Sequence, residues 1–252
     1  MMLNIVVPMA GRGSRFAKEG YVDPKPLIKL KDKRMIQVVI NNLTPSIPHR
    51  FIFICQRQHV IDYSLDRYLK EWAPNSEVIC IDGITEGAAC TVMCAEELIN
   101  NDEPLMIANS DQWIDIDIND YLNYMKHEDL DGLIMTMKAD DPKWSYAEMN
   151  ENNHVTRVVE KEVVSDEATV GIYNYKKGAD FCRSVKRMIA LDQRSNGEFY
   201  VAPAYTLMYE NEGAKIGIYN IGEEANGMYG LGIPADLELF LSLDVSRKAL
   251  DF

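Results

Sequence analysis

The residues of this chain best suited to chemistry lie within its first 34 positions. The segment Gly11-Arg12-Gly13-Ser14-Arg15 follows an apolar run, and Lys25 stands between Pro24 and Pro26 ten residues after it. Glycine lets backbone N–H groups approach phosphate oxygens, because positive φ values cost it little. Each proline fixes its own φ, and Pro26 biases Lys25 toward an extended shape. The spacing predicts a cradle for the phosphates of a nucleoside triphosphate (NTP), although the loop lacks the ending of a P-loop.

The charge of the chain is unevenly distributed. The 252 residues carry a net charge of −13, but residues 1–34 hold eight Lys and Arg against three acidic residues. An acidic protein with one basic segment suits a compact anionic ligand, and nucleic acid or an anionic membrane is not expected as a partner. The sequence lacks an apolar run of about 18 residues and a signal-peptide pattern. We therefore expect a cytoplasmic protein.

Apolar β-branched runs alternate with amphipathic stretches. We expect strands at 4–9, 50–55, 77–81 and 105–109, with helices at 35–43, 60–72 and 88–99 between them. Beyond Asp111 we expect helices at 116–127, 178–191 and 234–248, and strands at 131–138, 155–161, 168–175 and 215–221. The alternation predicts an α/β fold with a ligand crevice at the carboxyl edge of a parallel sheet.

The expected architecture is Rossmann-like (GT-A-like). It has a mostly parallel mixed sheet with helices on both faces, and a small antiparallel element on the acceptor side formed by pairing 155–161 with 168–175. The sequence has no linker or repeat, which predicts a single domain over residues 1–252. Residues 1–111 would form the nucleotide-binding half and residues 112–252 the acceptor-binding half.

The pattern Gly11-x-Gly13-Ser14-Arg15, followed by Pro24-Lys25-Pro26-Leu27, resembles the sugar-phosphate nucleotidyltransferase (NTP transferase) family. The resemblance covers nearly the whole chain and is strongest to short bacterial members tied to capsule or surface-polysaccharide pathways. It implies transfer of a nucleoside monophosphate to a phosphorylated acceptor, with release of pyrophosphate. Arg15 would grip the β- and γ-phosphates, and Lys25 would hold the α-phosphate and the incoming phosphate. The other implied nucleotide contacts are Met9, Ala10, Gly11, Gly13, Ser14 and, less firmly because the family varies there, Arg12.

The same resemblance places Gly87 and Ala88 against the base, and Asp82 at the edge of the base. An ionised carboxylate only accepts hydrogen bonds. Asp82 would therefore suit the amino group of cytosine and oppose the O4 atom of uracil or thymine. This favours CTP, with dTTP or UTP next. The alternative is that Asp82 is an ordinary turn residue.

Asp111 follows the strand expected at 105–109, and the resemblance makes it the ligand of Mg²⁺. Mg²⁺ commonly uses one or two carboxylates together with substrate phosphates. Many relatives carry a second aspartate where this chain has Gly230. Glu198 and Asp236 are near in the sequence, but neither is a safe substitute. The site would therefore use one carboxylate, take a second ligand from elsewhere, or be inactive.

On the acceptor side the resemblance implies a Glu-Lys pair. Glu160 would bind hydroxyl or amine groups and Lys161 the phosphate, with Tyr146 and Gly171 close to the acceptor. The acceptor would be a sugar phosphate or another small phosphorylated molecule, such as an amino acid, amino alcohol or polyol. The resemblance also implies a homo-oligomer.

Two other classes of function remain open. Asp115-x-Asp117 mimics the metal motif of a GT-A-like glycosyltransferase, although acidic residues there also suit the start of the next helix. Gly230 allows a non-catalytic nucleotide-binding protein.

Overall fold

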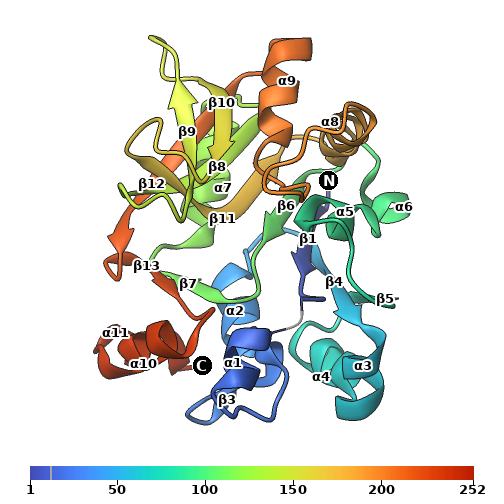
Figure 1. The fold of residues 1–252 in the computed structure, drawn as a ribbon, viewed down its shortest axis with the longest axis vertical. Helices are drawn as coiled ribbons and strands as arrows, with labels where there is room; N and C mark the ends of the chain where they lie inside the picture. The colour runs from blue at the N-terminus through green and yellow to red at the C-terminus, as the bar shows by residue number, and fades with distance from the viewer. Residues whose placement is uncertain (12) are drawn as a thin grey trace.

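The protein is described by a computed structural model that covers residues 1–11 and 13–252. Its centre is a mixed sheet of eleven strands in the order β5-β4-β1-β6-β11-β8-β12-β13-β7, from which β9 and β10 branch at β11 (Figure 1). The strands are β1 (Leu3–Pro8), β4 (His49–Gln56), β5 (Glu77–Ile81), β6 (Leu105–Ala108), β7 (Gln112–Ile114), β8 (Gly132–Lys138), β9 (Ser145–Met149), β10 (Val155–Glu160), β11 (Glu167–Tyr175), β12 (Ile216–Glu224) and β13 (Gly227–Gly230). A separate two-stranded sheet pairs β2 (Lys29–Leu30) with β3 (Lys33–Arg34). The predicted α/β class is confirmed.

Helices surround the sheet. They are α1 (Ser14–Lys18), the 3-10 turn η1 (Lys25–Leu27), α2 (Met35–Leu43), α3 (Arg57–Tyr63), α4 (Leu65–Trp72), α5 (Ala88–Met93), α6 (Glu96–Ile99), α7 (Ile118–His127), α8 (Gly178–Ala190), α9 (Ala204–Glu212), α10 (Pro234–Ser242) and α11 (Val245–Leu250). Figure 1 shows α10 and α11, in red, beside α1 and β3 at one end of the molecule. Within residues 1–11 and 13–252, none of these helices is long and apolar enough to cross a membrane.

The N-terminal part of the sheet is parallel, as expected. β1 pairs in parallel with both β4 and β6, and β4 pairs in parallel with β5. Ile5 and Val7 enter the core on one face, while Val6 enters the core on the other. A strand buried on both faces reads as a continuous apolar run, which is why β1 is recognisable from sequence.

The expected pairing of 155–161 with 168–175 is wrong. β10 pairs with β9, whereas β11 pairs with β6, β8 and β9. An Asn-rich turn closes the β9–β10 hairpin, where the Asn150 N–H donates to the carbonyl of His154 over 2.9 Å. Asn153 in this turn adopts a left-handed φ of 59°, a conformation that asparagine tolerates. The turn signal was missed because β9 itself is short and only partly apolar.

Three helices are interrupted where the periodicity predicted continuous ones. Ser64, at a left-handed φ of 51°, separates α3 from α4. The predicted helix at 88–99 is divided into α5 and α6, and the helix at 234–248 into α10 and α11. An apolar stripe can continue across such a break, so the pattern alone does not reveal it.

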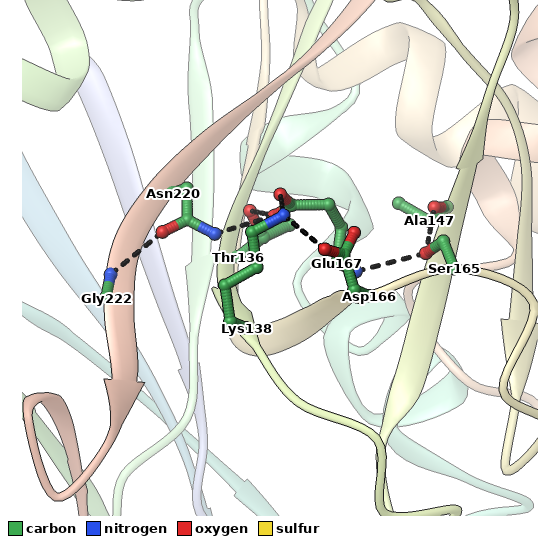
Figure 2. Close-up of polar contacts among 8 residues, drawn as sticks. All are labelled: Thr136, Lys138, Ala147, Ser165, Asp166, Glu167, Asn220 and Gly222. Atoms are coloured by element: carbon green, nitrogen blue, oxygen red, sulfur yellow. Dashed lines mark hydrogen bonds and ion pairs between the residues drawn. The ribbon is translucent and has the colours of Figure 1, made fainter.

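β11 begins at a buried carboxylate. Glu167 is only 5% exposed, and Figure 2 shows its partners on neighbouring strands. Lys138 Nζ lies 2.7 Å from Oε1, Thr136 Oγ1 donates to Oε2 over 2.6 Å, and Asn220 Nδ2 donates to Oε2 over 2.8 Å. A buried charge is tolerated when it is paired and hydrogen-bonded in this way. The network joins β8, β11 and β12 just before an irregularity in β11 between Thr169 and Tyr173.

Candidate active site

Two cavities meet beyond the carboxyl ends of β1 and β6. The smaller, of about 240 Å³, is lined by Met9, Gly11 and Gly13 of the loop after β1 (the first loop), and by Lys25 and Asp111. The larger, of about 370 Å³, is lined by Arg15, Glu160, Lys161 and Gly171, among others. Asn109 and Asp111 line both cavities. The loop after β1 and Lys25 therefore lie on one side of this junction, and Glu160, Lys161 and Gly171 lie on the other together with Arg15.

The first loop lies against the backbone that carries Lys25. Gly13 precedes α1 at a left-handed φ of 60°, and a Cβ atom there would lie 3.2 Å from the Cβ of Lys25. Gln56, at the end of β4, donates from Nε2 to the carbonyl of Ala10 over 2.6 Å and to that of Gly83 over 2.5 Å. Gln56 thus joins two loops at the carboxyl edge, a role that the sequence pattern did not indicate.

Met9, Gly11 and Gly13 line the smaller cavity. Ala10 lies between Met9 and Gly11 in the chain, Ser14 follows Gly13, and Arg12 lies outside the residues that the structure describes.

Lys25 and Asp111 form an ion pair at the junction. Lys25 Nζ contacts Asp111 Oδ2, and the two side chains are 24% and 25% exposed. Attraction between opposite charges is stronger in such a partly buried setting than in bulk water. The structure brings together a lysine and a carboxylate that are 86 positions apart in the sequence.

The segment expected to face the base is held by the chain near Phe199. Gly87 has a φ of 134°, and a Cβ atom there would lie only 2.4 Å from the carbonyl oxygen of Phe199. Phe199 N donates to the carbonyl of Glu86 over 2.8 Å, and Ala89 N donates to the carbonyl of Phe199 over 3.0 Å. Ala88 and the neighbouring Tyr200 both line the larger cavity. The base segment and the acceptor cavity therefore share one wall.

Asp82 follows β5 and forms an ion pair that the sequence did not predict. Its two carboxylate oxygens accept from Arg57 Nε over 3.0 and 3.1 Å. The Asp82 side chain is nevertheless 75% exposed. The hydrogen bond and charge of Asp82 raise the pKa of Arg57. Any contact of Asp82 with a base would be made by a carboxylate that already has a cationic neighbour.

Glu160 ends β10, Lys161 follows it, and both line the larger cavity. Burial raises the pKa of Glu160, while a hydrogen bond with Ser145 and the charge of Lys161 act in the opposite direction. Lys161 has a left-handed φ of 59°, and its backbone N donates to the carbonyl of Trp144 over 3.0 Å. Such a conformation is costly for a lysine, and strain of this kind is often found at functional sites.

Gly171 lies where β11 approaches Asn109. Its φ is 82°, and a Cβ atom there would lie 2.0 Å from Asn109 Nδ2. Asn109 N also donates to the carbonyl of Gly171 over 3.0 Å. Position 171 therefore requires glycine, both for its conformation and for the close approach of the Asn109 side chain.

Tyr146 does not lie where the sequence prediction placed it. Its side chain is buried in the core, and its hydroxyl donates to the carbonyl of Asp141 over 2.7 Å. Its neighbours Trp144 and Ser145 line the larger cavity instead. Successive residues of a strand point to opposite faces, so an error of one position reverses the direction of a side chain.

Two further charged residues, Lys143 and Asp236, line the larger cavity. The sequence pattern did not indicate Lys143, and it placed Asp236 only near Gly230. Lys143 Nζ lies 2.9 Å from both carboxylate oxygens of Glu224. Burial, and then the charge of Glu224, raise the pKa of Asp236, while the charges of Lys143 and Arg15 act in the opposite direction. Asp236 belongs to α10 and lies close in sequence to Gly230 and Gly232, which also line the cavity, but the sequence pattern does not show that α10 turns its carboxylate into the cavity.

Asp115 and Asp117 lie at a different cavity, of about 230 Å³. Asp117 caps α7, since its carboxylate accepts from Asn119 N over 2.8 Å. Asp115 forms an ion pair with Lys248. The reading of this motif as the start of a helix is confirmed.

The donors at the junction suit Mg²⁺ better than a softer metal. Among residues 1–11 and 13–252, no group of three His, Cys, Asp or Glu side chains is placed to hold a metal ion. Asp111 and Asp236 both line the larger cavity. One or two carboxylates are what Mg²⁺ takes from a protein when substrate phosphates supply other ligands.

Comparison with known proteins identifies the family. The family model described as "Nucleotidyl transferase" matches residues 5–200. The chain belongs to the nucleotidyl transferase family. It is 25% identical over 178 residues to a mannose-1-phosphate guanyltransferase of Neurospora crassa, which covers 68% of this chain and 49% of that protein. The chain therefore spans about half the length of that curated relative.

Solved structures share the fold of this nucleotidyl transferase family member. A nucleoside-diphosphate-sugar pyrophosphorylase from Vibrio cholerae superposes with a TM-score of 0.79 at 21% identity, covering 95% of this chain and 100% of that one. An inositol-1-phosphate CTP transferase from T. maritima superposes with a TM-score of 0.72 at 14% identity, covering 98% and 94% of the two chains. At these identities the likeness establishes the architecture.

Proposed function

We propose that the protein transfers a nucleoside monophosphate from an NTP to a small phosphorylated acceptor. An oxygen of the acceptor phosphate attacks the α-phosphorus, the bond between the α-phosphorus and its bridging oxygen breaks, and pyrophosphate leaves with the electron pair. The observation that carries the proposal is the position of Asp111, which lines both cavities and contacts Lys25. The reacting phosphates would meet at that junction.

Catalysis in this scheme rests on positioning and charge. The acceptor phosphate is ionised at neutral pH, so the reaction needs no general base. Lys25 would hold the α-phosphate and the entering phosphate, and Arg15 would steer the pyrophosphate. Bound Mg²⁺ would neutralise part of the triphosphate charge beside Asp111. Groups fixed in advance around developing charge lower the barrier without reorganisation during the reaction.

On the acceptor side, Lys161 would bind the acceptor phosphate and Glu160 its hydroxyl or amine groups. Both residues line the larger cavity, together with Gly171 and Ser145. The proposed acceptor is a sugar phosphate, and a phosphorylated amino acid, amino alcohol or polyol is the alternative. A mannose-1-phosphate enzyme and an inositol-1-phosphate enzyme among the similar proteins support keeping both classes.

For the nucleotide we propose CTP, because an ionised Asp82 accepts hydrogen bonds and cannot donate them. dTTP and UTP are the next candidates, and GTP joins them because a guanyltransferase is among the similar proteins. The proposed setting is the cytoplasm, where NTPs are available, and the proposed assembly is a homo-oligomer. The product would be an activated building block for a surface polysaccharide.

The direct test measures pyrophosphate release in the presence of Mg²⁺. ATP, GTP, CTP, UTP and dTTP are each combined with a panel of sugar, polyol, amino-alcohol and amino-acid phosphates. We expect release only when both substrates are present, and only for one or a few pairs. Nucleotide binding in calorimetry without turnover across the panel would contradict the enzyme and support a binding protein. Transfer from a nucleotide sugar without pyrophosphate would indicate a glycosyltransferase.

A further inference from the structure

Gly230, the last residue of β13, and Gly232, two positions later, each lie close to a carboxylate. A Cβ atom on Gly230 would lie 3.2 Å from Asp236 Oδ2, and a Cβ atom on Gly232 would lie 2.6 Å from Asp111 Oδ2. Both glycines line the larger cavity, whereas Leu231 between them is fully buried in the core on the other side. Two residues of extended chain span at most about 7 Å. The carboxylates of Asp111 and Asp236 therefore lie along one short stretch of the same cavity wall.

The backbone holds this wall against Asp111. Leu231 N donates to the carbonyl of Asp111 over 2.8 Å, and β13 pairs with β7 directly after Asp111. A side chain at position 232 would displace the Asp111 carboxylate. Glycine at this position therefore leaves room for Asp111 in the cavity. The conformation of Gly230 is open to L-residues, since its φ is not in the left-handed region. A side chain at position 230 would occupy the space that Asp236 fills, and it would not strain the backbone.

The helix that carries Asp236 is firmly packed. α10 begins with Pro234, a residue suited to the first turn. Phe240 of the same helix packs on Trp113 and Tyr229, with ring centroids 6.0 and 5.7 Å away. Because Trp113 and Tyr229 belong to β7 and β13, the helix packs directly on the strands next to the glycine segment. Asp236 is thus positioned by the core, although an acidic residue in a first helical turn also suits the helix dipole.

We propose that Asp236 is the second protein carboxylate for the divalent cation at Asp111, and that it fills the space left by Gly230. The inference rests on the proposed function, which calls for a divalent cation beside the triphosphate. Only six positions separate residues 230 and 236, but α10 turns back so that its carboxylate faces the glycine. The chain would therefore keep a two-carboxylate site without an acidic residue at position 230.

The test measures Mn²⁺ binding by the electron paramagnetic resonance signal of the free ion. Mn²⁺ replaces Mg²⁺ as the probe, with the protein alone and with each of the five nucleotides. We expect Asp111→Asn and Asp236→Asn each to weaken binding by about tenfold or more, on the scale of a disturbed metal site. Glu238→Gln is the matched control, because it removes the same charge from an exposed position of the same helix. It should leave Mn²⁺ affinity unchanged.

A double variant tests the shared space directly. Asp236→Ala combined with Gly230→Asp places a carboxylate on the position that Asp236 fills, and it should regain most of the Mn²⁺ affinity lost in Asp236→Ala. Thermal melting of each variant separates loss of the site from loss of the fold. A structural role at the helix start would lower the melting temperature of Asp236→Asn without a specific loss of Mn²⁺.

Three results would overturn the inference. They are normal Mn²⁺ binding by folded Asp236→Asn, a folded double variant that binds no better than Asp236→Ala, and no Mn²⁺ binding by the unaltered protein under any condition. The pyrophosphate screen is read separately. If the unaltered protein showed turnover but Asp236→Asn bound Mn²⁺ normally, the proposed function would be supported and the role of Asp236 would be rejected. If the variants bound Mn²⁺ as expected but no substrate pair gave turnover, the carboxylate pair would be supported and the proposed function would be rejected.

Discussion

The two sides of the junction are built in different ways. The nucleotide side takes its loop and Lys25 from one short N-terminal segment that follows β1, a strand buried at the centre of the parallel sheet. The acceptor side gathers Lys143, Glu160, Gly171 and Asp236 from four separate segments. The first side is a contiguous motif on a rigid strand, and the second is an assembly that exists only in the folded chain.

The two sides also differ in backbone strain, because a left-handed non-glycine residue lines only the acceptor side among the residues that the structure describes. On the nucleotide side, Lys25 and Asp111 carry opposite charges and form an ion pair at the junction. On the acceptor side, Lys161 has a left-handed backbone, and Gly171 admits the side chain of Asn109 where no Cβ atom would fit. Residues in such conformations persist only when the surrounding structure holds them. We expect changes on the nucleotide side to act on chemistry, and changes on the acceptor side to act on stability and binding together.

Lys25→Ala is expected to have the largest effect. Turnover should fall at least ~100-fold, the scale of losing one fixed electrostatic stabiliser, because Lys25 would hold both reacting phosphates. Pyrophosphate release and thermal melting measure rate and fold. Lys29→Ala, at an exposed position of β2, is the control for removing a lysine from this segment. A near-normal rate in folded Lys25→Ala would show that Lys25 does not hold the reacting phosphates.

Gly171→Ala probes the acceptor side. The methyl group would meet Asn109 Nδ2 at 2.0 Å, in a conformation with a φ of 82°. We expect a loss of roughly 1–3 kcal/mol of stability from the backbone strain, and a fall of about tenfold or more in kcat/KM for the acceptor from displacement of the wall, since misplaced groups are costly.

Gly213→Ala separates the effect of backbone strain from the effect of displacing the cavity wall. Gly213 also has a left-handed φ, of 63°, but a Cβ atom there would meet no other atom within 4 Å. This variant should lose stability from strain alone and keep its kcat/KM. Equal kinetic effects at the two positions would mean that Gly171 has no particular relation to the acceptor cavity.

The contrast explains what could be predicted from the sequence. The parallel half was predictable because a buried strand such as β1 has a continuous apolar pattern, and the motif around Lys25 is contiguous. The β9–β10 hairpin was missed because a short, half-polar strand has little pattern of its own. Tyr146 was misplaced by a single position within that strand. Asp236 could not be assigned, because its approach to Gly230 depends on how α10 packs against β7 and β13. The roles of the site residues remain predictions.

Glu160→Gln is expected to act in opposite directions on binding and stability. Burial raises the pKa of Glu160, so the contribution of this carboxyl to stability is fully present below its unfolded pKa of 4.5. That contribution is lost as pH rises through the higher folded pKa. Glutamine does not titrate, so Glu160→Gln should melt above the unaltered protein near neutral pH, and the difference should shrink as pH falls toward 4.5. At this chain length each kcal/mol shifts Tm by roughly 2–4 °C.

The same variant should raise KM for the acceptor by about tenfold, the scale of losing one hydrogen bond to a charged group, because Glu160 would bind hydroxyl or amine groups. Glu162→Gln, at an exposed neighbouring position, should change neither Tm with pH nor KM. If Glu160→Gln raised Tm without changing KM, the buried carboxylate would have no part in acceptor binding.

Asp82→Asn should give the smallest effect, and it sharpens the comparison at the base. Asp82 is highly exposed and already accepts from Arg57, and exposed ionic contacts contribute only about 0–1 kcal/mol. Asparagine can donate as well as accept, so the ratio of kcat/KM for CTP over UTP should fall by no more than about fivefold, which is that energy expressed as a ratio. Arg57→Ala is the control, since it frees the carboxylate without changing its hydrogen-bonding character and should preserve the preference. An unchanged ratio in Asp82→Asn would assign base selection to the backbone near Gly87. The nucleotide side would then depend, like the acceptor side, on contacts that only the folded chain provides.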